Sequence, residues 1–177
     1  MKPVSNKASR PPARLIMSTP EHCLAFGLGS GLAPVAPGTV GSLLGVPVWL
    51  MLCWMPLEWH LGAVALLVVL GVWICGESAR MLGVGDDPGI VLDEIAGFQI
   101  AALPLLPALA ISGLPLWLGL LLAFVLFRVF DIAKPWPISW FDRNLHGGLG
   151  IMLDDLLAGL FAASALWGSV HVFNSLS

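Results

Sequence analysis

Six acidic residues stand at or inside the ends of otherwise apolar stretches, and their type and spacing could support chemistry. They come from four separate stretches: Glu77, Asp93, Glu94, Asp131, Asp154 and Asp155. A carboxylate inside an apolar segment is costly, so it normally faces the protein interior or water and has a partner. Crowded acids repel one another unless a proton or a cation neutralises them. We therefore expect these acids to converge on a cation.

Carboxylate oxygens suit hard cations, and Mg²⁺ typically uses a few carboxylates while it keeps water and binds phosphate. Asp93-Glu94 and Asp154-Asp155 are adjacent pairs whose side chains point about 100° apart around a helix axis. One member of each pair would face the ion, and which member does so is open. The alternative is that these acids only cap helices at the membrane interface, which leaves unexplained why each pair follows three apolar residues.

Arg128, Asp131 and Lys134 recur every third residue, which places them near one face of a helix. They could form a plain ion-pair ladder, and each cation alone could simply extend to the membrane surface. Beside a carboxylate cluster, binding of phosphate oxygens is the better interpretation of Arg128 and Lys134. His22 and His146 are weaker candidates, as proton donors to a leaving group.

A glycine-containing segment, Gly38-Thr39-Val40-Gly41-Ser42, precedes the first long apolar stretch. Glycine allows close approach of the backbone, and free amides at a helix start attract anions. Gly38, Thr39 and Ser42 are therefore candidate phosphate-binding residues. A tight turn with close helix packing explains the same glycines equally well.

The composition indicates that membrane helices position these residues. Of 177 residues, 58% are hydrophobic and 11% charged, with a mean hydropathy of +0.90, whereas soluble domains are about half apolar and a quarter charged. Lipid must therefore be part of the solvent. The net charge of −3 offers no basic patch, which excludes nucleic acid as a partner.

We predict an all-α, polytopic membrane protein with about five transmembrane helices. The apolar stretches are residues 39–55, 60–79, 90–106, 116–133 and 150–173, several of them near the ~20 residues that cross a bilayer. We expect residues 1–17 to be a flexible cytoplasmic tail and residues 18–177 a single membrane-embedded catalytic domain. This domain would begin with a short interfacial or re-entrant helix and a Gly/Pro-rich loop.

The basic residues predict the orientation, because cytoplasmic flanks collect Lys and Arg. Five spans with the N-terminus inside put all eight basic residues at or near the cytoplasmic side, together with every acid except Glu58. We therefore expect the N-terminus and the site to be cytoplasmic.

Four blocks in a specific order carry the candidate residues. They are Ala36-Pro37-Gly38-Thr39-Val40-Gly41-Ser42, Ile90-Val91-Leu92-Asp93-Glu94-Ile95-Ala96-Gly97, Phe127-Arg128-Val129-Phe130-Asp131-Ile132-Ala133-Lys134-Pro135 and Gly150-Ile151-Met152-Leu153-Asp154-Asp155-Leu156-Leu157-Ala158-Gly159. Together they resemble the phosphatidylglycerophosphatase A family of bacterial inner-membrane enzymes. The resemblance implies Mg²⁺-dependent hydrolysis of phosphatidylglycerophosphate to phosphatidylglycerol and phosphate, in phospholipid biosynthesis. It also implies a phospholipid substrate and leaves the oligomeric state open.

Combining the residues with this resemblance gives a mechanistic hypothesis. The candidate metal ligands are Asp93, Glu94, Asp154, Asp155 and Glu77, and the candidate catalytic residues are Asp131, Asp93 and Asp155. The ion would polarise the phosphate and activate a water, Asp131 would ligate the ion or orient the water, and the cations would hold the phosphoryl oxygens. An aspartyl-phosphate intermediate uses the same residue types and stays open.

A small transporter or ion pathway is the main rival hypothesis, because buried acids can form a relay across a membrane. The acids of such a relay should be spread through the depth of the bilayer. Here they gather at one side, which favours a site that is accessible from the surface.

Overall fold

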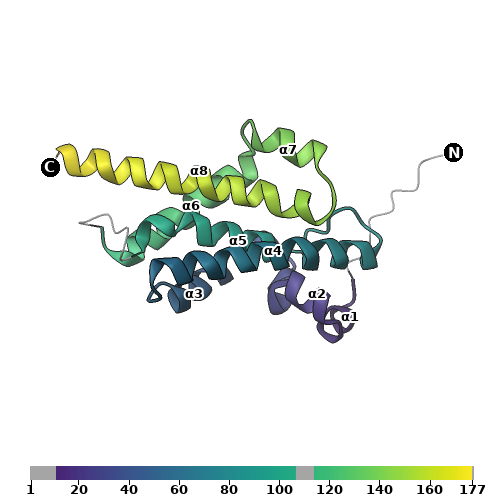
Figure 1. The fold of residues 1–177 in the computed structure, drawn as a ribbon. Helices are drawn as coiled ribbons and strands as arrows, with labels where there is room; N and C mark the ends of the chain where they lie inside the picture. The colour runs from purple at the N-terminus through teal and green to yellow at the C-terminus, as the bar shows by residue number, and fades with distance from the viewer. Residues whose placement is uncertain (1–10, 107–113, 177) are drawn as a thin grey trace.

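The computed structural model describes residues 11–106 and 114–176, with the backbone alone for residues 170 and 172–176. All regular elements in this part of the chain are helices (Figure 1). In order they are α1 (Ala13–Ser18), α2 (Pro20–Ala25), η1 (Gly27–Leu32), α3 (Pro37–Leu52), α4 (Leu57–Leu82), α5 (Leu92–Ala101), η2 (Leu103–Leu105), α6 (Leu116–Ala133), α7 (Ile138–Asn144) and α8 (Gly147–Leu176), where η denotes a 3₁₀ helix. The predicted all-α class is confirmed.

Three of the described helices are long and apolar enough to cross a membrane: α4, α6 and the part of α8 over Gly147–Ser169. Helix α3 is apolar but has only 16 residues. The predicted span over residues 90–106 instead forms α5, which has 10 residues, and then η2. Helix α5 is about 15 Å long, half the hydrocarbon thickness. The count of five transmembrane helices is therefore not confirmed.

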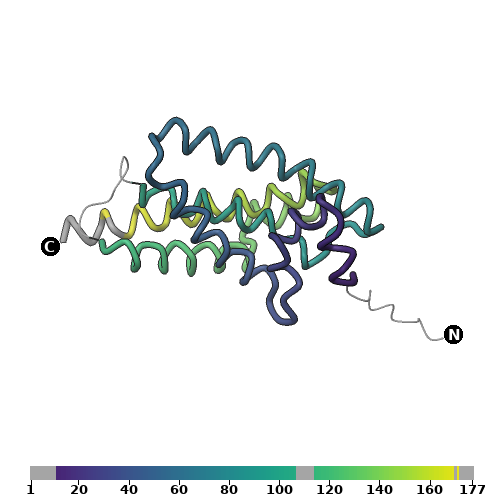
Figure 2. Tube along the Cα trace, turned by 90° about the horizontal axis from the view of Figure 1, so that it is seen from below, coloured from purple at the N-terminus to yellow at the C-terminus, as the bar shows by residue number. Residues whose placement is uncertain are grey.

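Helix α5 lies at the centre of the molecule, where it contacts α3, α4, α6 and α8. Figure 2 shows the same arrangement from a second direction, with the long helices running side by side. Eight of the ten residues of α5 are buried. Neighbouring helices, rather than lipid, therefore surround most of α5.

Two glycines explain how closely α5 approaches α8. A Cβ atom on Gly97 would lie 2.6 Å from the backbone oxygen of Asp155, and one on Gly159 would meet the backbone oxygen of Gly97. Small residues at such crossings let two membrane helices pack backbone to backbone. This packing brings the acid pair of α8 beside the start of α5.

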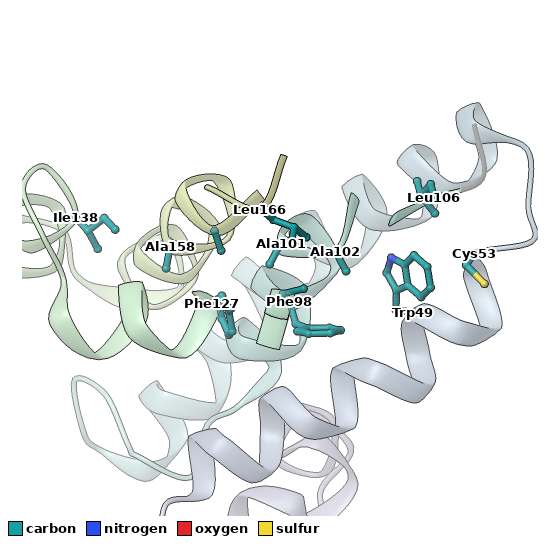
Figure 3. Close-up of a cluster of buried hydrophobic side chains, with 12 residues drawn as sticks. Trp49, Cys53, Phe98, Ala101, Ala102, Leu106, Phe127, Ile138, Ala158 and Leu166 are labelled. Atoms are coloured by element: carbon teal, nitrogen blue, oxygen red, sulfur yellow. The ribbon is translucent and has the colours of Figure 1, made fainter. Parts of the chain in front are cut away.

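A hydrophobic cluster joins α3, α5, α6 and α8 (Figure 3). Trp49 from α3, Phe98 from α5 and Phe127 from α6 are its largest fully buried side chains. Ala158 and Ala162 of α8 complete the contact from the other side. Large rings pack opposite small residues here, as is typical of close-packed protein interiors.

Helix α4 ends on the right in Figure 1, and α5 and α8 begin on the same side of the molecule. Helix α4 stops where Gly83 takes a left-handed conformation, with φ of 70°, as is common at helix C-termini. Helix α6 stops at Lys134, which precedes Pro135, a residue that disfavours helix before it. Helices α5 and α8 start at the same end, so the acid-bearing segments converge there.

The N-terminal elements cover this end. Helix α2 begins at Pro20, as the sequence predicts, and the segment after it forms η1 rather than an extended loop. Residues 13–18, which fall largely in the expected tail, form α1, and its Ile16 is buried against the rest of the protein. Residues 1–10 of the expected tail lie outside the described part of the chain.

Candidate active site

Three acids from two helices come together at the convergent end. Asp93 and Glu94 of α5 and Asp155 of α8 each offer a carboxylate oxygen, and these oxygens lie within 4.8 Å of one another. Asp93 and Asp155 are buried. Glu94 Oε2 and Asp155 Oδ1 are buried without a hydrogen-bond partner among the described residues. Unpaired buried carboxylate oxygens are costly, and a hard cation is the ligand that such oxygens suit.

Arg128 of α6 lies next to both this acid trio and α3. Its Nη1 atom forms an ion pair with Asp131 and lies 3.9 Å from Glu94 Oε1. The same nitrogen donates a hydrogen bond of 3.2 Å to Ser42 Oγ. Asp131 is also close enough to Asp155 of α8 for the two carboxylates to interact electrostatically. Arg128 and Asp131 therefore connect α6 to both acid-bearing helices.

The first turn of α3 lies directly against the acid trio. Glu94 Oε1 is so close to Gly38 that a Cβ there would collide with it. The amides of Thr39 and Val40 already donate to the carbonyl of Ala36, and Ser42 Oγ donates to the carbonyl of Gly38 at 2.8 Å. The positive end of a helix favours a nearby carboxylate or phosphate. Ser42 joins the site through its hydroxyl group.

Lys134 forms a second cationic position, at the end of α6. Its Nζ atom lies 2.5 Å from Asp142 Oδ1 and 2.6 Å from Asp154 Oδ2. Burial lowers the pKa of Lys134, but hydrogen bonds to the two carboxylates outweigh burial and raise the pKa above its ordinary value. The ammonium group is therefore charged throughout the physiological pH range.

A polar cavity of about 260 Å³ adjoins Asp154. Asp86, Asp142 and His146 line it. Asp86 is exposed, yet partial desolvation, and then repulsion from Asp154, raise its pKa to about 6. This cavity gives water a route toward the charged end of the bundle.

Two of the predicted site residues lie apart from this constellation. Glu77 pairs with exposed Arg80 one turn further along α4, with hydrogen bonds to Arg80 Nε and Nη2. His22 is buried, and its Nδ1 lies 2.8 Å from Ser78 Oγ. Both residues have local partners, and neither belongs to the group of three acids.

Asp86 and Asp142 are not among the site residues predicted from the sequence. Asp86 lies in the connection between α4 and α5, and Asp142 lies in α7. Unlike the acid pairs, neither follows an apolar run. Their position near Lys134 and Asp154 arises from the long-range packing of α7 and α8.

The fold and site together define an all-helical membrane protein with a carboxylate-rich site flanked by two cations, a combination suited to phosphate chemistry. The sequence profile of the phosphatidylglycerophosphatase A family matches residues 23–170. The chain belongs to this family, and it is therefore an enzyme, a lipid phosphatase.

Individual relatives agree with the profile. The chain is 44% identical to the phosphatidylglycerophosphatase A of Escherichia coli (strain K12) over 159 residues, covering 90% of this chain and 88% of the relative. Its identity to the phosphatidylglycerophosphatase A of Haemophilus influenzae is 41% over 155 residues, covering 87% and 91%. A putative phosphatidylinositol-3-phosphatase of Bacteroides thetaiotaomicron is 38% identical over 146 residues, covering 78% and 86%. No solved structure matches the chain.

Proposed function

We propose that this chain hydrolyses phosphatidylglycerophosphate to phosphatidylglycerol and phosphate, with Mg²⁺, at the cytoplasmic face of a bacterial inner membrane. The observation that carries the proposal is the trio Asp93, Glu94 and Asp155, with its unpaired oxygens, beside Arg128. The relatives from E. coli and H. influenzae, named for this activity, support the choice of substrate.

The acid trio would hold the divalent cation. The donor set consists of carboxylate oxygens, and two of them are buried without a partner in the described part of the chain. This donor set fits Mg²⁺ rather than a metal that prefers sulfur or imidazole. When bound, Mg²⁺ supplies positive charge against the phosphate and makes water more acidic.

The two cations of α6 would bind the substrate phosphate. Arg128 has a buried Nε atom without a partner among the described residues, and its guanidinium group carries further N–H donors that would bind a phosphoryl oxygen. Lys134 adds a second charge near Asp154. Positive groups fixed around a phosphoryl group stabilise the charge that develops in its transition state.

Asp131 would orient the attacking water and accept its proton. Its carboxylate forms an ion pair with Arg128, which fixes its position beside the acid trio. Attack by the water oxygen forms a new P–O bond and breaks the bond from phosphorus to the glycerol oxygen. One water is thereby added across the ester, and the leaving oxygen ends protonated.

A covalent route uses the same residues. A carboxylate would attack phosphorus and form an aspartyl phosphate, which water would then hydrolyse. Brief reaction with substrate that carries labelled phosphate, followed by acid quenching, separates the two routes. Label retained on the protein would support the covalent route and exclude direct attack by water.

The proposed function is tested by phosphate release from purified protein in detergent, with Mg²⁺ or with EDTA. Phosphatidylglycerophosphate, phosphatidylinositol 3-phosphate and phosphatidic acid serve as parallel substrates. We expect release from the first substrate, loss with EDTA and recovery when Mg²⁺ is restored. Release from phosphatidylinositol 3-phosphate alone would instead assign the activity after which the B. thetaiotaomicron relative is named.

The transporter alternative is not favoured. The acids gather near the starts of α5 and α8, whereas the hydrophobic cluster that joins α3, α5, α6 and α8 contains no charged residue. A relay across the membrane needs polar groups through its depth, and the family assignment supports an enzyme.

A further inference from the structure

An apolar groove lies on the outer surface of the bundle between the start of α3 and the second half of α6. Its volume is about 450 Å³. Its lining residues are Thr39, Phe124, Val125, Arg128, Val129, Ile132 and Ala133. Val125, Val129 and Ile132 are exposed, so the groove opens toward the surroundings of the bundle.

Arg128 belongs to both the groove and the charged site. One part of this side chain lines the groove, while its Nη1 atom contacts Ser42, Asp131 and Glu94. On the side of α3, Thr39 lines the groove and its neighbour Gly38 touches Glu94. The groove therefore leads from the membrane-facing surface to the acid trio.

We propose that this groove binds an acyl chain of the phospholipid substrate, so that the lipid enters the site sideways between α3 and α6. The proposal rests on the proposed function. A phosphate held at Arg128 keeps the attached glycerol within a few bonds of the groove, and apolar walls favour a hydrocarbon chain. Other exposed apolar residues of α6 meet bulk lipid, whereas this surface is hollowed and ends at the phosphate-binding cation.

The polar cavity beside Asp154 does not suit an acyl chain. Asp86, Asp142 and His146 line it, and burial of hydrocarbon against ionised groups would remove their water without replacing it. The two openings therefore have separate roles. The groove between α3 and α6 receives the acyl chain, and the cavity beside α7 and α8 receives water.

The test fills the groove with a larger side chain. Val125→Trp places an indole in the groove, and Val69→Trp, at an exposed position of α4, is the matched control. Each variant is assayed with diacyl phosphatidylglycerophosphate in mixed micelles and with the deacylated headgroup, glycerophosphoglycerophosphate. Light scattering measures the oligomeric state of each variant.

We expect Val125→Trp to lower kcat/KM for the diacyl substrate about tenfold, because part of the chain loses its contact surface. The value for the deacylated substrate should stay within about twofold of the unmodified protein, and Val69→Trp should change neither value. An equal loss on both substrates, or no loss on either, would overturn the acyl-chain assignment.

Two further outcomes also test the acyl-chain assignment. A changed oligomeric state in Val125→Trp without a change in kcat/KM would show that a second protein copy occupies the groove, which overturns the assignment. Release of phosphate from neither substrate by the unmodified protein would overturn the proposed function and this inference together.

Discussion

The Nζ atom of Lys134 lies 2.6 Å from Oδ2 of Asp154, and this contact ties the end of α6 to α8. The same nitrogen lies 2.5 Å from Asp142 Oδ1 in α7. One ammonium group thus joins three helices beside the acid trio. Its removal would leave two carboxylates close together without the charge that balances them.

Lys134→Met should therefore lower both stability and activity. We expect a loss of about 1–3 kcal/mol in the free energy of unfolding, because the pair is partly buried and partly screened. Inhibition by inorganic phosphate should weaken as well if Lys134 binds the product. Asp142→Asn is the control, since it keeps the contact with Asp154. Phosphate inhibition that is unchanged in Lys134→Met would limit this lysine to a structural role.

Arg128→Lys should lower kcat/KM about 10²-fold, as loss of one fixed donor to a developing charge typically does. A lysine ammonium cannot reach Ser42, Asp131 and Glu94 together, as the planar guanidinium group does. Steady-state phosphate release measures the effect. Arg143→Lys, at an exposed position in α7, is the matched control and should retain full activity. Equal kinetics in the two variants would remove Arg128 from the phosphate site.

Gly38→Ala should lower activity at least about tenfold, because the new methyl group displaces Glu94 by an ångström or more from its place in the trio. Gly62→Ala, in the interior of α4, meets no atom within 4 Å. That control should keep activity and gain about 0.5–1 kcal/mol in stability. Activity and thermal unfolding of both variants in detergent are the measurements. Full activity of Gly38→Ala would show that Glu94 tolerates displacement.

Asp155→Asn should abolish binding of a divalent ion, whereas Glu77→Gln should have little effect. Asp155 belongs to the buried trio, while Glu77 pairs with Arg80. Spectroscopic titration with Mn²⁺ as a probe measures binding independently of turnover. Weaker Mn²⁺ binding by Glu77→Gln would show that Glu77 is a metal ligand. Undiminished Mn²⁺ affinity in Asp155→Asn would exclude a metal at the trio.

Asp86 should make the protein less stable as the pH rises from about 4 to about 6. Its pKa is raised to about 6, whereas an unfolded aspartate titrates near pH 3.9. The native state therefore holds the proton more tightly in this window, and stability falls as the proton is lost. Asp86→Asn should raise the melting temperature slightly at pH 7.5 and leave it unchanged at pH 4. Identical shifts at both pH values would contradict this assignment.

The sequence was most informative about the long helices and about the acid pairs. Helices α4, α6 and α8 follow from uninterrupted hydropathy over a sufficient length. Convergence of Asp93, Glu94 and Asp155 was predictable because a carboxylate beside an apolar run needs a partner. The adjacency of each pair did not predict that Asp154 faces Lys134 while Asp155 faces α5.

The predicted span over residues 90–106 is not confirmed, and hydropathy alone cannot settle it because the protein interior and lipid favour the same residues. The segment ends as a helix at Ala101 and continues as η2, where Pro104 lies. Burial among four helices is sufficient to explain its apolar character. Glu77 was selected from its position in an apolar segment, although Arg80 is a sufficient partner one turn away.

The central position of α5 constrains how the protein is made. This helix is too short to cross the bilayer alone, and it carries Asp93, Glu94 and Gln99. Two of its neighbours, α6 and α8, leave the ribosome after it. Helix α5 therefore cannot reach its final packing until α8 has been inserted. Until then it lies beside α3 and α4 or at the headgroup layer. Since α8 also supplies Asp154 and Asp155, the set of acidic site residues is complete only after α8 has been made.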